Sequence, residues 1–231
     1  IGNAATAALV DARGDICWMC LPRFDGDPLF CGLLEPVAGP DEGRWSIRVD
    51  NLAECHQAYR RNTAILETVL TDDQGNSLRI IDFLPRFHDR GRMFRGRTLV
   101  RIVQPVQGMP RITLRLRPRH GYGAQAARAR RGSNHLRYEL GEDSLRLTTT
   151  APVEFVLNET PFLLDRPQVF LLGPDEPLSD APEAIAARFL ERTEAYWTDW
   201  VRALSIPPDY QEAVIRAAIT LKLCEYEETG G

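Results

Sequence analysis

Short runs of apolar residues recur at every second position from about Ala7 to Leu172, and this alternation constrains the fold more than any other feature of the chain. Successive side chains of a strand point to opposite faces of a sheet, so a period of two predicts strands with one buried face. The segments with this pattern are 7–11, 44–50, 64–72, 77–84, 98–106, 111–118, 135–140, 144–150, 153–158 and 168–173. Because no helical pattern separates them, we predict a mainly β fold, a large antiparallel β-sandwich.

Turn-forming residues separate several of these segments. The stretches DDQGNS (72–77), QGMP (107–110) and GEDS (141–144) are rich in residues that favour tight turns. Two of the three join neighbouring strands closely enough to predict hairpins. The length of 231 residues suits one large all-β domain or two small ones.

The pattern changes at Asp180, where an amphipathic helix of about 23 residues is predicted. Asp180 can cap this helix, Pro182 suits its first turn, and Glu183 supports the cap three residues later. Apolar side chains three or four positions apart then form one face, which contains Ile185, Phe189, Tyr196, Trp200 and Leu204, with Trp197 and Val201 beside them. We expect the two tryptophans to be packing residues.

SIPPD (205–209) ends this helix, and a second helix is predicted from about Asp209 to Tyr226. Its apolar residues cover two sides, formed by Val214, Ala218 and Leu221 and by Ile215, Ile219 and Tyr226. A helix that is apolar on nearly every side belongs inside a protein. Because one companion helix cannot cover all these sides, we expect further partners outside this chain.

Thirteen arginines and no acidic residue lie between Arg90 and Tyr138. Such a block can contact phosphates or nucleic acid. On a strand such as RITLRLRPR (111–119), however, arginines alternate outward while apolar residues point the other way. Aromatic residues for base stacking are scarce here, and no nucleic-acid-binding motif occurs, so we expect no nucleic-acid partner.

Five cysteines stand at positions 17, 20, 31, 55 and 224. Their number is small and odd, which argues against a disulfide framework and favours a reducing cytoplasm. In CWMC, Cys17 and Cys20 lie in a predicted strand, whereas a redox pair needs a helix N-terminus. Structural zinc needs four ligands, and only Cys31, Cys55 and His56 lie nearby, at irregular spacing. We therefore predict buried small side chains, with no metal and no cofactor.

The sequence contains no run of eighteen apolar residues, which predicts that the chain does not span a membrane. Its first residues lack a basic start followed by an apolar core, so no signal peptide is expected. A natural start before Ile1 stays open, as does the oligomeric state.

Several long motifs resemble those of one enzyme family. The stretch IGNAATAALVDARGDICWMCLPRFD (1–25) resembles the opening of bacterial and archaeal glycoside hydrolase family 15 proteins, the glucoamylase and trehalase group. The similarity continues through RRNTAILETVLTDDQGNSLRIIDFLPR (60–86) and LVRIVQPVQGMPRITLRLRPRHGYG (99–123). It ends with EAYWTDWVRAL (194–204) and YQEAVIRAAITLKLCEYEETGG (210–231), so it covers nearly the whole chain in the family's order. The family usually has Asp where Cys17 stands here.

The resemblance implies an N-terminal antiparallel β-sandwich (a supersandwich), then a linker helix, then a barrel of paired α-helices that holds the active site. We therefore expect a sandwich domain over residues 1–178, a linker helix over 179–208 and the start of a truncated α/α barrel over 209–231. The implied function is the non-catalytic N-terminal part of an inverting, exo-acting α-glucoside hydrolase of glucoamylase, glucodextranase or trehalase type. The alternative is a free-standing carbohydrate-binding or structural interaction module.

Inverting glycoside hydrolysis needs two carboxyl groups about 6.5–9.5 Å apart, one as acid and one to activate water. The resemblance places both catalytic glutamates beyond Gly231, so we assign no catalytic residue. Neighbouring residues such as Glu227 and Glu228 rarely face each other across a sugar, and Asp25 and Asp27 resemble turn residues. Asp82, flanked by apolar residues in IIDFLP, is predicted to be a buried or hydrogen-bonded structural carboxylate.

The stretch PRFDGDPLF (22–30) is the best candidate for contact with a substrate. Arg23 and Asp25 can hydrogen-bond sugar hydroxyls, and Phe24 or Trp18 can stack on a sugar face. The resemblance implies that this loop packs near the barrel. Two interpretations stay open, a rim of the substrate cleft or an interdomain contact that fixes the two domains.

Overall fold

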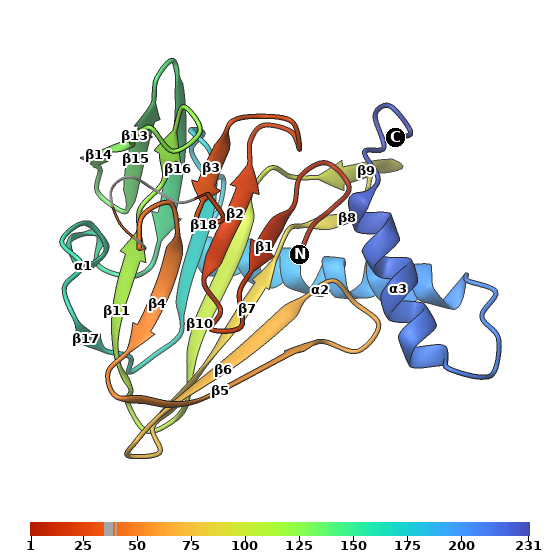
Figure 1. The fold of residues 1–231 in the computed structure, drawn as a ribbon, viewed down its shortest axis with the longest axis horizontal. Coiled ribbons are helices and arrows are strands. Elements are labelled where there is room, and N and C mark those ends of the chain that lie inside the picture. The colour runs from red at the N-terminus through yellow and green to blue at the C-terminus, as the bar shows by residue number, and fades with distance from the viewer. Residues whose placement is uncertain (35–38, 40) are drawn as a thin grey trace.

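A computed structural model describes residues 1–34, 39 and 41–231, and it is mainly β, with two large antiparallel sheets followed by helices (Figure 1). The smaller sheet has the order β1-β2-β4-β11-β17, with β3 paired to β2. Its strands are β1 (Ala8–Val10), β2 (Ile16–Cys20), β3 (Pro28–Cys31), β4 (Trp45–Val49), β11 (Arg111–Leu116) and β17 (Phe162–Leu163). This architecture confirms the predicted sandwich.

The larger sheet has the order β14-β15-β16-β18-β10-β7-β6-β5. Its strands are β5 (Leu52–Tyr59), β6 (Leu66–Asp72), β7 (Ser77–Phe83), β10 (Leu99–Gln107), β14 (Arg128–Arg131), β15 (His135–Leu140), β16 (Asp143–Thr149) and β18 (Gln168–Pro174). Two small hairpins complete the strands, β8 (Arg86–Asp89) with β9 (Arg92–Arg95) and β12 (Arg119–His120) with β13 (Gln125–Ala126). The helices are α1 (Val153–Leu157), α2 (Pro182–Arg202) and α3 (Gln211–Cys224).

The main core lies between the two large sheets. Trp45 of the smaller sheet is 1% exposed, and its ring meets that of Phe170 of the larger sheet edge-on, with centroids 6.2 Å apart. On β7 and β10 the side chains alternate, so Leu78 and Val103 enter this core. The period-two pattern in the sequence therefore sorts residues between two faces, as predicted.

The outer face of the larger sheet is also apolar, and helix α2 covers part of it (Figure 1). Val100 and Leu171 on this face pack with Ile185 and Ala186 of the helix. Because both faces of the central strands are buried, the alternation in β7 and β10 includes apolar residues on each side.

A buried ion pair interrupts the apolar core. Arg101 of β10 and Asp82 of β7 are both fully buried, and the guanidinium donates to the two carboxylate oxygens over 2.7 and 2.9 Å. Arg101 also donates to the backbone oxygens of Trp45 and Gly14, which belong to the smaller sheet and to the turn before β2. The pair thus bridges the two layers, and the prediction for Asp82 is confirmed.

Two of the predicted turns close hairpins. The turn at 72–77 joins β6 to β7, which pair, and Gly141 and Glu142 join β15 to β16, which also pair. QGMP (107–110) instead carries the chain from β10 in the larger sheet to β11 in the smaller one. The expectation of two hairpins is confirmed.

The prediction of a strand at 153–158 is wrong. These residues form the short helix α1, in which Val153 and Val156 are the buried positions. Over five residues the pattern VEFVL fits a period of two and a spacing of three equally well, and Pro152 immediately before it suits a helix start. Strand β5 was not predicted from the sequence. Nearly all its side chains are exposed, so the segment has no alternation of apolar and polar residues.

Helix α2 has Pro182 in its first turn, as the sequence predicted, but the expected cap by Asp180 is wrong. The N-cap residue is Ala181 and has no side-chain cap bond. The Asp180 carboxylate instead lies 3.2 Å from Arg188, two turns into the helix. The Trp197 side chain is fully buried, which confirms it as a packing residue.

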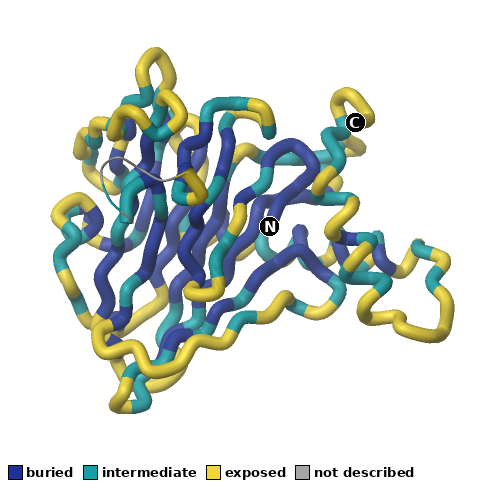
Figure 2. The backbone as a smooth tube through the Cα atoms, viewed as in Figure 1, coloured by how far each residue is buried: buried dark blue, intermediate teal, exposed yellow. Residues whose placement is uncertain are grey.

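Helix α3 is shorter than predicted at both ends and stands to one side of the sandwich (Figure 1). Ile219 is 1% exposed and packs with Trp197 and Val201 of α2 and with Ala64. Leu221 on the other side is 73% exposed, and most of the helix is half-buried or exposed (Figure 2). The expectation that one companion helix leaves part of α3 uncovered is confirmed.

Among the described residues, no helix is both long and apolar enough to cross a membrane.

Candidate functional site

The loop after β2 carries three of the four predicted site residues. Arg23 and Asp25 are exposed in this loop, and Phe24 between them is half-buried. The fourth, Trp18, lies within β2, where it pairs with Leu9 and Cys31. Within the described residues, Trp18 makes no ring contact or hydrogen bond with the other three, so the structure does not bring it into their group.

Arg23 and Asp25 form a two-pronged ion pair. The Arg23 Nε and terminal nitrogen lie 2.9 and 2.7 Å from the two Asp25 oxygens. The hydrogen bond from Arg23 lowers the pKa of Asp25, and the same bond raises the pKa of Arg23. Their side chains are 49% and 69% exposed, so water screens the pair and its net contribution to stability is small.

The segment after α3 completes this group. The Phe24 and Tyr226 rings meet edge-on, with centroids 6.0 Å apart, and the Arg23 guanidinium lies 5.3 Å from the centre of the Tyr226 ring. The Tyr226 hydroxyl donates to Glu228 over 2.6 Å, and this bond raises the pKa of Tyr226. We call Arg23, Phe24, Asp25, Tyr226 and Glu228 the loop–tail cluster. It offers two aromatic rings and exposed polar groups to solvent.

A buried arginine holds the tail beside this cluster. Arg86, which is 2% exposed, donates to the backbone oxygen of Asn3 over 2.8 Å and forms an ion pair with Glu227. Its guanidinium also lies over the Tyr196 ring of α2, 4.8 Å from the centroid. The Glu227 amide donates to the backbone oxygen of Ala4 over 3.3 Å. Arg86 therefore ties the tail to the N-terminal turn and to α2.

Glu227 is surrounded by cations. Besides Arg86, Lys222 lies 2.5 Å and Arg95 lies 3.4 Å from its carboxylate oxygens. Burial by itself raises the pKa of Glu227, but the hydrogen bonds from Arg86 and Lys222 outweigh this effect, and the pKa lies below its ordinary value. A carboxylate held in this way remains charged and fixed, which suits a structural anchor.

The other carboxylates considered as candidates are also engaged. The Asp27 carboxylate accepts hydrogen bonds from the backbone N–H groups of Gly121 and Tyr122, the latter over 2.7 Å. Such bonds to backbone N–H groups are typical of a turn residue. Glu228 binds Tyr226, and Asp25 binds Arg23. Each of these side chains thus has a contact that accounts for its position.

The cysteines fall into two groups. Cys17, Cys20 and Cys31 are buried, and burial raises the pKa of each thiol, so these thiols are protonated at neutral pH. Cys55 and Cys224 are exposed. In the part of the chain that the structure describes, no three or more His, Cys, Asp or Glu side chains lie close enough together to hold a metal ion.

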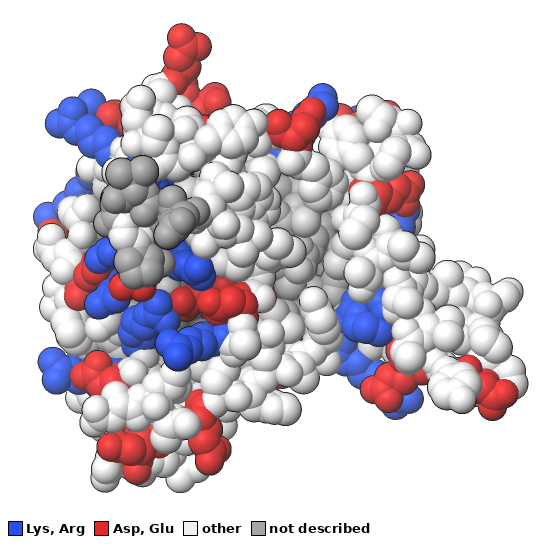
Figure 3. All heavy atoms as spheres, viewed as in Figure 1, with Lys and Arg blue, Asp and Glu red and all other residues white. Residues whose placement is uncertain are grey.

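Most arginines of the block between Arg90 and Tyr138 form ion pairs with acidic residues from other parts of the chain. Those paired are Arg95, Arg101, Arg111, Arg115, Arg117, Arg119, Arg130, Arg131 and Arg137. Figure 3 shows basic and acidic atoms interspersed on the face it presents. Acidic side chains therefore offset most of the positive charge of this block.

Sequence reasoning missed Arg86, Tyr226 and Glu228. Arg86 and its partner Glu227 lie 141 positions apart, and no local spacing reveals such a pair. The only available signal was the polar residue in the apolar stretch FLPRF, since a buried arginine must find an acceptor.

The comparisons with known proteins agree on one family. The family model described as "Trehalase-like, N-terminal" matches residues 1–161. The trehalase of Thermoplasma volcanium is 26% identical over 100% of this chain and 37% of its own length. The trehalase of Thermoplasma acidophilum is 25% identical over 96% of this chain and 39% of its own length. Trehalase 1 of Sulfolobus acidocaldarius is 37% identical over a shorter stretch, 37% of this chain and 14% of its own length.

No solved structure matches this chain. The chain spans less than two fifths of the length of the two Thermoplasma trehalases. The family match covers more than half of the chain and includes the loop that carries Arg23, Phe24 and Asp25. The chain therefore belongs to the trehalase-like N-terminal domain family.

Proposed function

We propose that this chain forms the non-catalytic N-terminal part of a glycoside hydrolase that cleaves α-glucosidic bonds with inversion, of the glucoamylase, glucodextranase or trehalase type. The observation that carries this proposal is the match over residues 1–161 to a family of trehalase-like N-terminal domains. The two catalytic carboxyl groups of such an enzyme stand about 6.5–9.5 Å apart around a sugar. Because the candidate carboxylates here are held in ion pairs and turns, we place the catalytic pair in sequence outside these 231 residues.

We further propose a sandwich domain over residues 1–178, a linker helix over 179–208, and the start of an α/α barrel over 209–231. The exposed side of α3, where Leu221 is 73% exposed, supports this division because such a face suits the interior of a larger helical domain. The five free cysteines, found here without a disulfide among the described residues, support a cytoplasmic location.

The role proposed for the sandwich is to brace the catalytic domain and to shape one rim of its cleft. The contact of Phe24 with Tyr226 supports the bracing role, because it joins the sandwich to the segment after α3. Arg23 and Asp25 are exposed at this contact and would hydrogen-bond sugar hydroxyls at the rim. Trp18, which lies apart from them in β2, would stack on a sugar face from the side of the sandwich.

The experiment uses the complete gene product and follows trehalose hydrolysis by NMR that resolves the glucose anomers. Inversion puts the water oxygen on the opposite face of the attacked carbon, so each trehalose gives one β-glucose and one α-glucose. A retaining enzyme gives two α-glucose molecules. Maltose and maltotriose in parallel reactions distinguish a trehalase from a glucoamylase.

The matched control is the 231-residue chain by itself. We expect it to release no glucose from any of these substrates, since removal of the acid and base costs orders of magnitude in rate. Turnover by this chain would overturn the placement of the catalytic residues. Initial α-glucose alone from trehalose would overturn inversion, and a complete gene product that hydrolyses no α-glucoside would overturn the proposed activity.

A further inference from the structure

A hollow at one end of the sandwich lies outside the loop–tail cluster. Its volume is about 210 Å³, and it lies where the β15–β16 hairpin of the larger sheet approaches the loop between β2 and β3 of the smaller sheet. Its lining includes Leu21, Asp27, Leu29, Arg97, Arg119, Leu140 and Asp143. The loop that carries the predicted site residues therefore has two sides, one toward Tyr226 and one toward this hollow.

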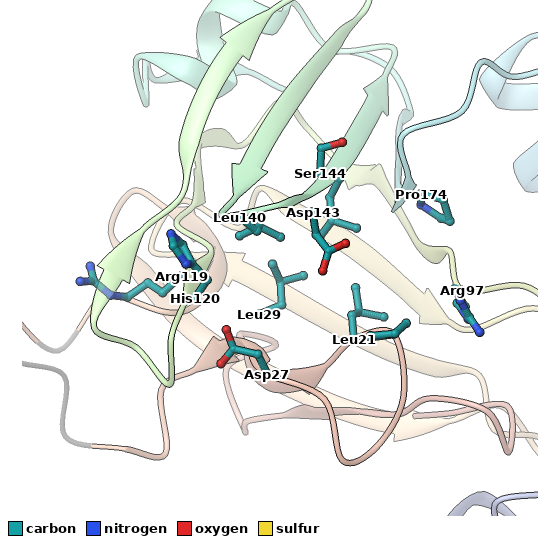
Figure 4. A pocket seen from close by; sticks show the side chains of 12 residues that line it. Leu21, Asp27, Leu29, Arg97, Arg119, His120, Leu140, Asp143, Ser144 and Pro174 are labelled. Carbon is teal, nitrogen blue, oxygen red and sulfur yellow. The ribbon is translucent and has the colours of Figure 1, made fainter.

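The floor of the hollow is apolar. Leu21, Leu29 and Leu140 gather at its centre (Figure 4). Two carboxylates, those of Asp27 and Asp143, approach these leucines from opposite walls (Figure 4). An apolar floor with a few converging polar groups is the usual composition of a small-molecule site.

The first carboxylate is fixed in place. Two backbone N–H groups, those of Gly121 and Tyr122, hold Asp27, the latter over 2.7 Å. A carboxylate has about four acceptor positions, so Asp27 can still accept hydrogen bonds from a ligand. Among the described residues, the backbone of Asp143 pairs with Leu140 but its carboxylate has no hydrogen-bond or ion-pair partner, so the carboxylate oxygens are free to accept as well.

The charges around the hollow favour a neutral ligand. Peptide N–H groups already donate hydrogen bonds to Asp27, and Arg119 forms an ion pair with Glu42 over 2.8 Å. Arg97 also lines the hollow and adds a positive charge to its wall. A cationic ligand would meet little net negative charge here, whereas hydroxyl groups can donate to both carboxylates and accept from Arg97.

The volume limits the size of the ligand. Sites for drug-sized molecules occupy about 300–1,000 Å³, and this hollow is smaller. A single six-membered polyol ring has a C–H face for the leucines and a rim of hydroxyl groups for the carboxylates. We propose that this hollow is a binding site for a neutral monosaccharide.

The test is a ¹H–¹⁵N NMR titration of the 231-residue protein with D-glucose. We expect saturable shifts of the Gly121, Tyr122 and Asp143 amides, with a dissociation constant on the order of 1–10 mM for a ligand of this size. Trehalose, with two rings, is expected to bind no more tightly than glucose. No glycosidic bond is cleaved in this experiment, so its result is independent of the proposed hydrolase activity.

Two variants and one control locate the site. Asp143→Ala removes a hydroxyl acceptor, and Leu140→Trp fills the hollow without removing a charge. Each is expected to raise the dissociation constant at least tenfold. Glu142→Ala removes the neighbouring carboxylate of the same turn, which does not line the hollow, and is expected to leave binding unchanged.

Three results would overturn the proposal. The first is the absence of saturable shifts up to about 100 mM glucose, well above the expected range. The second is binding that persists in both Asp143→Ala and Leu140→Trp, which would place the sugar elsewhere. The third is tighter binding of tetramethylammonium than of glucose, which would make the ligand cationic.

Discussion

Two arginine–aspartate pairs in this molecule share a two-pronged geometry but have opposite surroundings. Arg101 and Asp82 are both 0% exposed, with contacts of 2.7 and 2.9 Å. Arg23 and Asp25 are 49% and 69% exposed, with contacts of 2.9 and 2.7 Å. Because burial removes the competing water, the loss of one partner is costly only in the first pair.

The buried pair gives a direct stability test. Arg101→Leu leaves the Asp82 charge uncompensated in the core and is expected to lower the free energy of unfolding by about 3–5 kcal/mol. Arg23→Leu is the matched control, and the urea midpoint is expected to stay close to that of the unchanged protein. Equal losses in the two variants, measured by urea denaturation, would contradict this account.

Glu227 makes the attachment of the tail depend on pH. Its pKa in the folded protein lies below the ordinary value of 4.5, because the hydrogen bonds from Arg86 and Lys222 outweigh the effect of burial. Between these two pKa values the unfolded chain binds more protons than the folded one. The stabilisation is therefore fully present above about pH 4.5 and is lost as the pH falls through the folded pKa.

We expect the backbone contact between Glu227 and Ala4 to break as the pH falls below about 4.5. The NMR shift of the Glu227 amide reports this step. In Glu227→Gln, which cannot ionise, the pH-dependent step should be absent, while Glu228→Gln serves as the adjacent control. The same transition in Glu227→Gln as in the unchanged protein would show that another group is responsible.

At the level of the elements, the two sides of helix α3 differ strongly in exposure. Ile219 is 1% exposed against Trp197 and Val201, and Leu221, two residues later, is 73% exposed. The helix therefore depends on one contact face for its stability, since short helices are marginal by themselves in water.

Matched alanine substitutions measure this asymmetry. Ile219→Ala removes a buried side chain and is expected to cost about 2–5 kcal/mol of unfolding free energy, or of local stability if the helix opens separately. Leu221→Ala is expected to change it by less than about 0.5 kcal/mol. Amide hydrogen exchange along α3 checks both values. Equally large losses would mean that the side with Leu221 is covered in solution.

On the scale of the whole molecule, the first and last parts of the chain meet. The N-terminal turn contacts Glu227 through Arg86 and Ala4, and the loop after β2 contacts Tyr226 through Phe24. These contacts connect the sandwich to the segment that follows α3. The helical segment therefore follows the sandwich in sequence and also contacts the first residues of the sandwich.

A double-mutant cycle tests this connection. Phe24→Ala and Tyr226→Ala each remove one ring of the same edge-on pair, so the fall in unfolding temperature of the double variant should be smaller than the sum of the two single effects. Phe24→Ala combined with Phe155→Ala is the control, because Phe155 pairs with Phe162 elsewhere. Additive effects for Phe24 and Tyr226 would show that the rings do not interact in solution.

Local patterns in the sequence predicted which residues face inward on most of the strands. The period-two runs predicted β1, β4 and β11 of the smaller sheet and every strand of the larger sheet except β5 and β14. The polar Asp82 within an apolar run predicted a buried or hydrogen-bonded structural carboxylate. It also predicted Arg23, Phe24 and Asp25 as one group, because they are neighbours in one loop. These properties are local, since the side chains of one strand or turn have fixed relative directions.

The tertiary structure alone decided which of these residues meet. Arg101 joins Asp82 to the backbone of the other sheet, and Phe24 meets Tyr226 from the far end of the chain. At 153–158 the packing of Val153 and Val156 selected a helix where five residues fitted either period. Contacts between distant segments depend on how all the layers pack together, and no spacing within one segment encodes that arrangement.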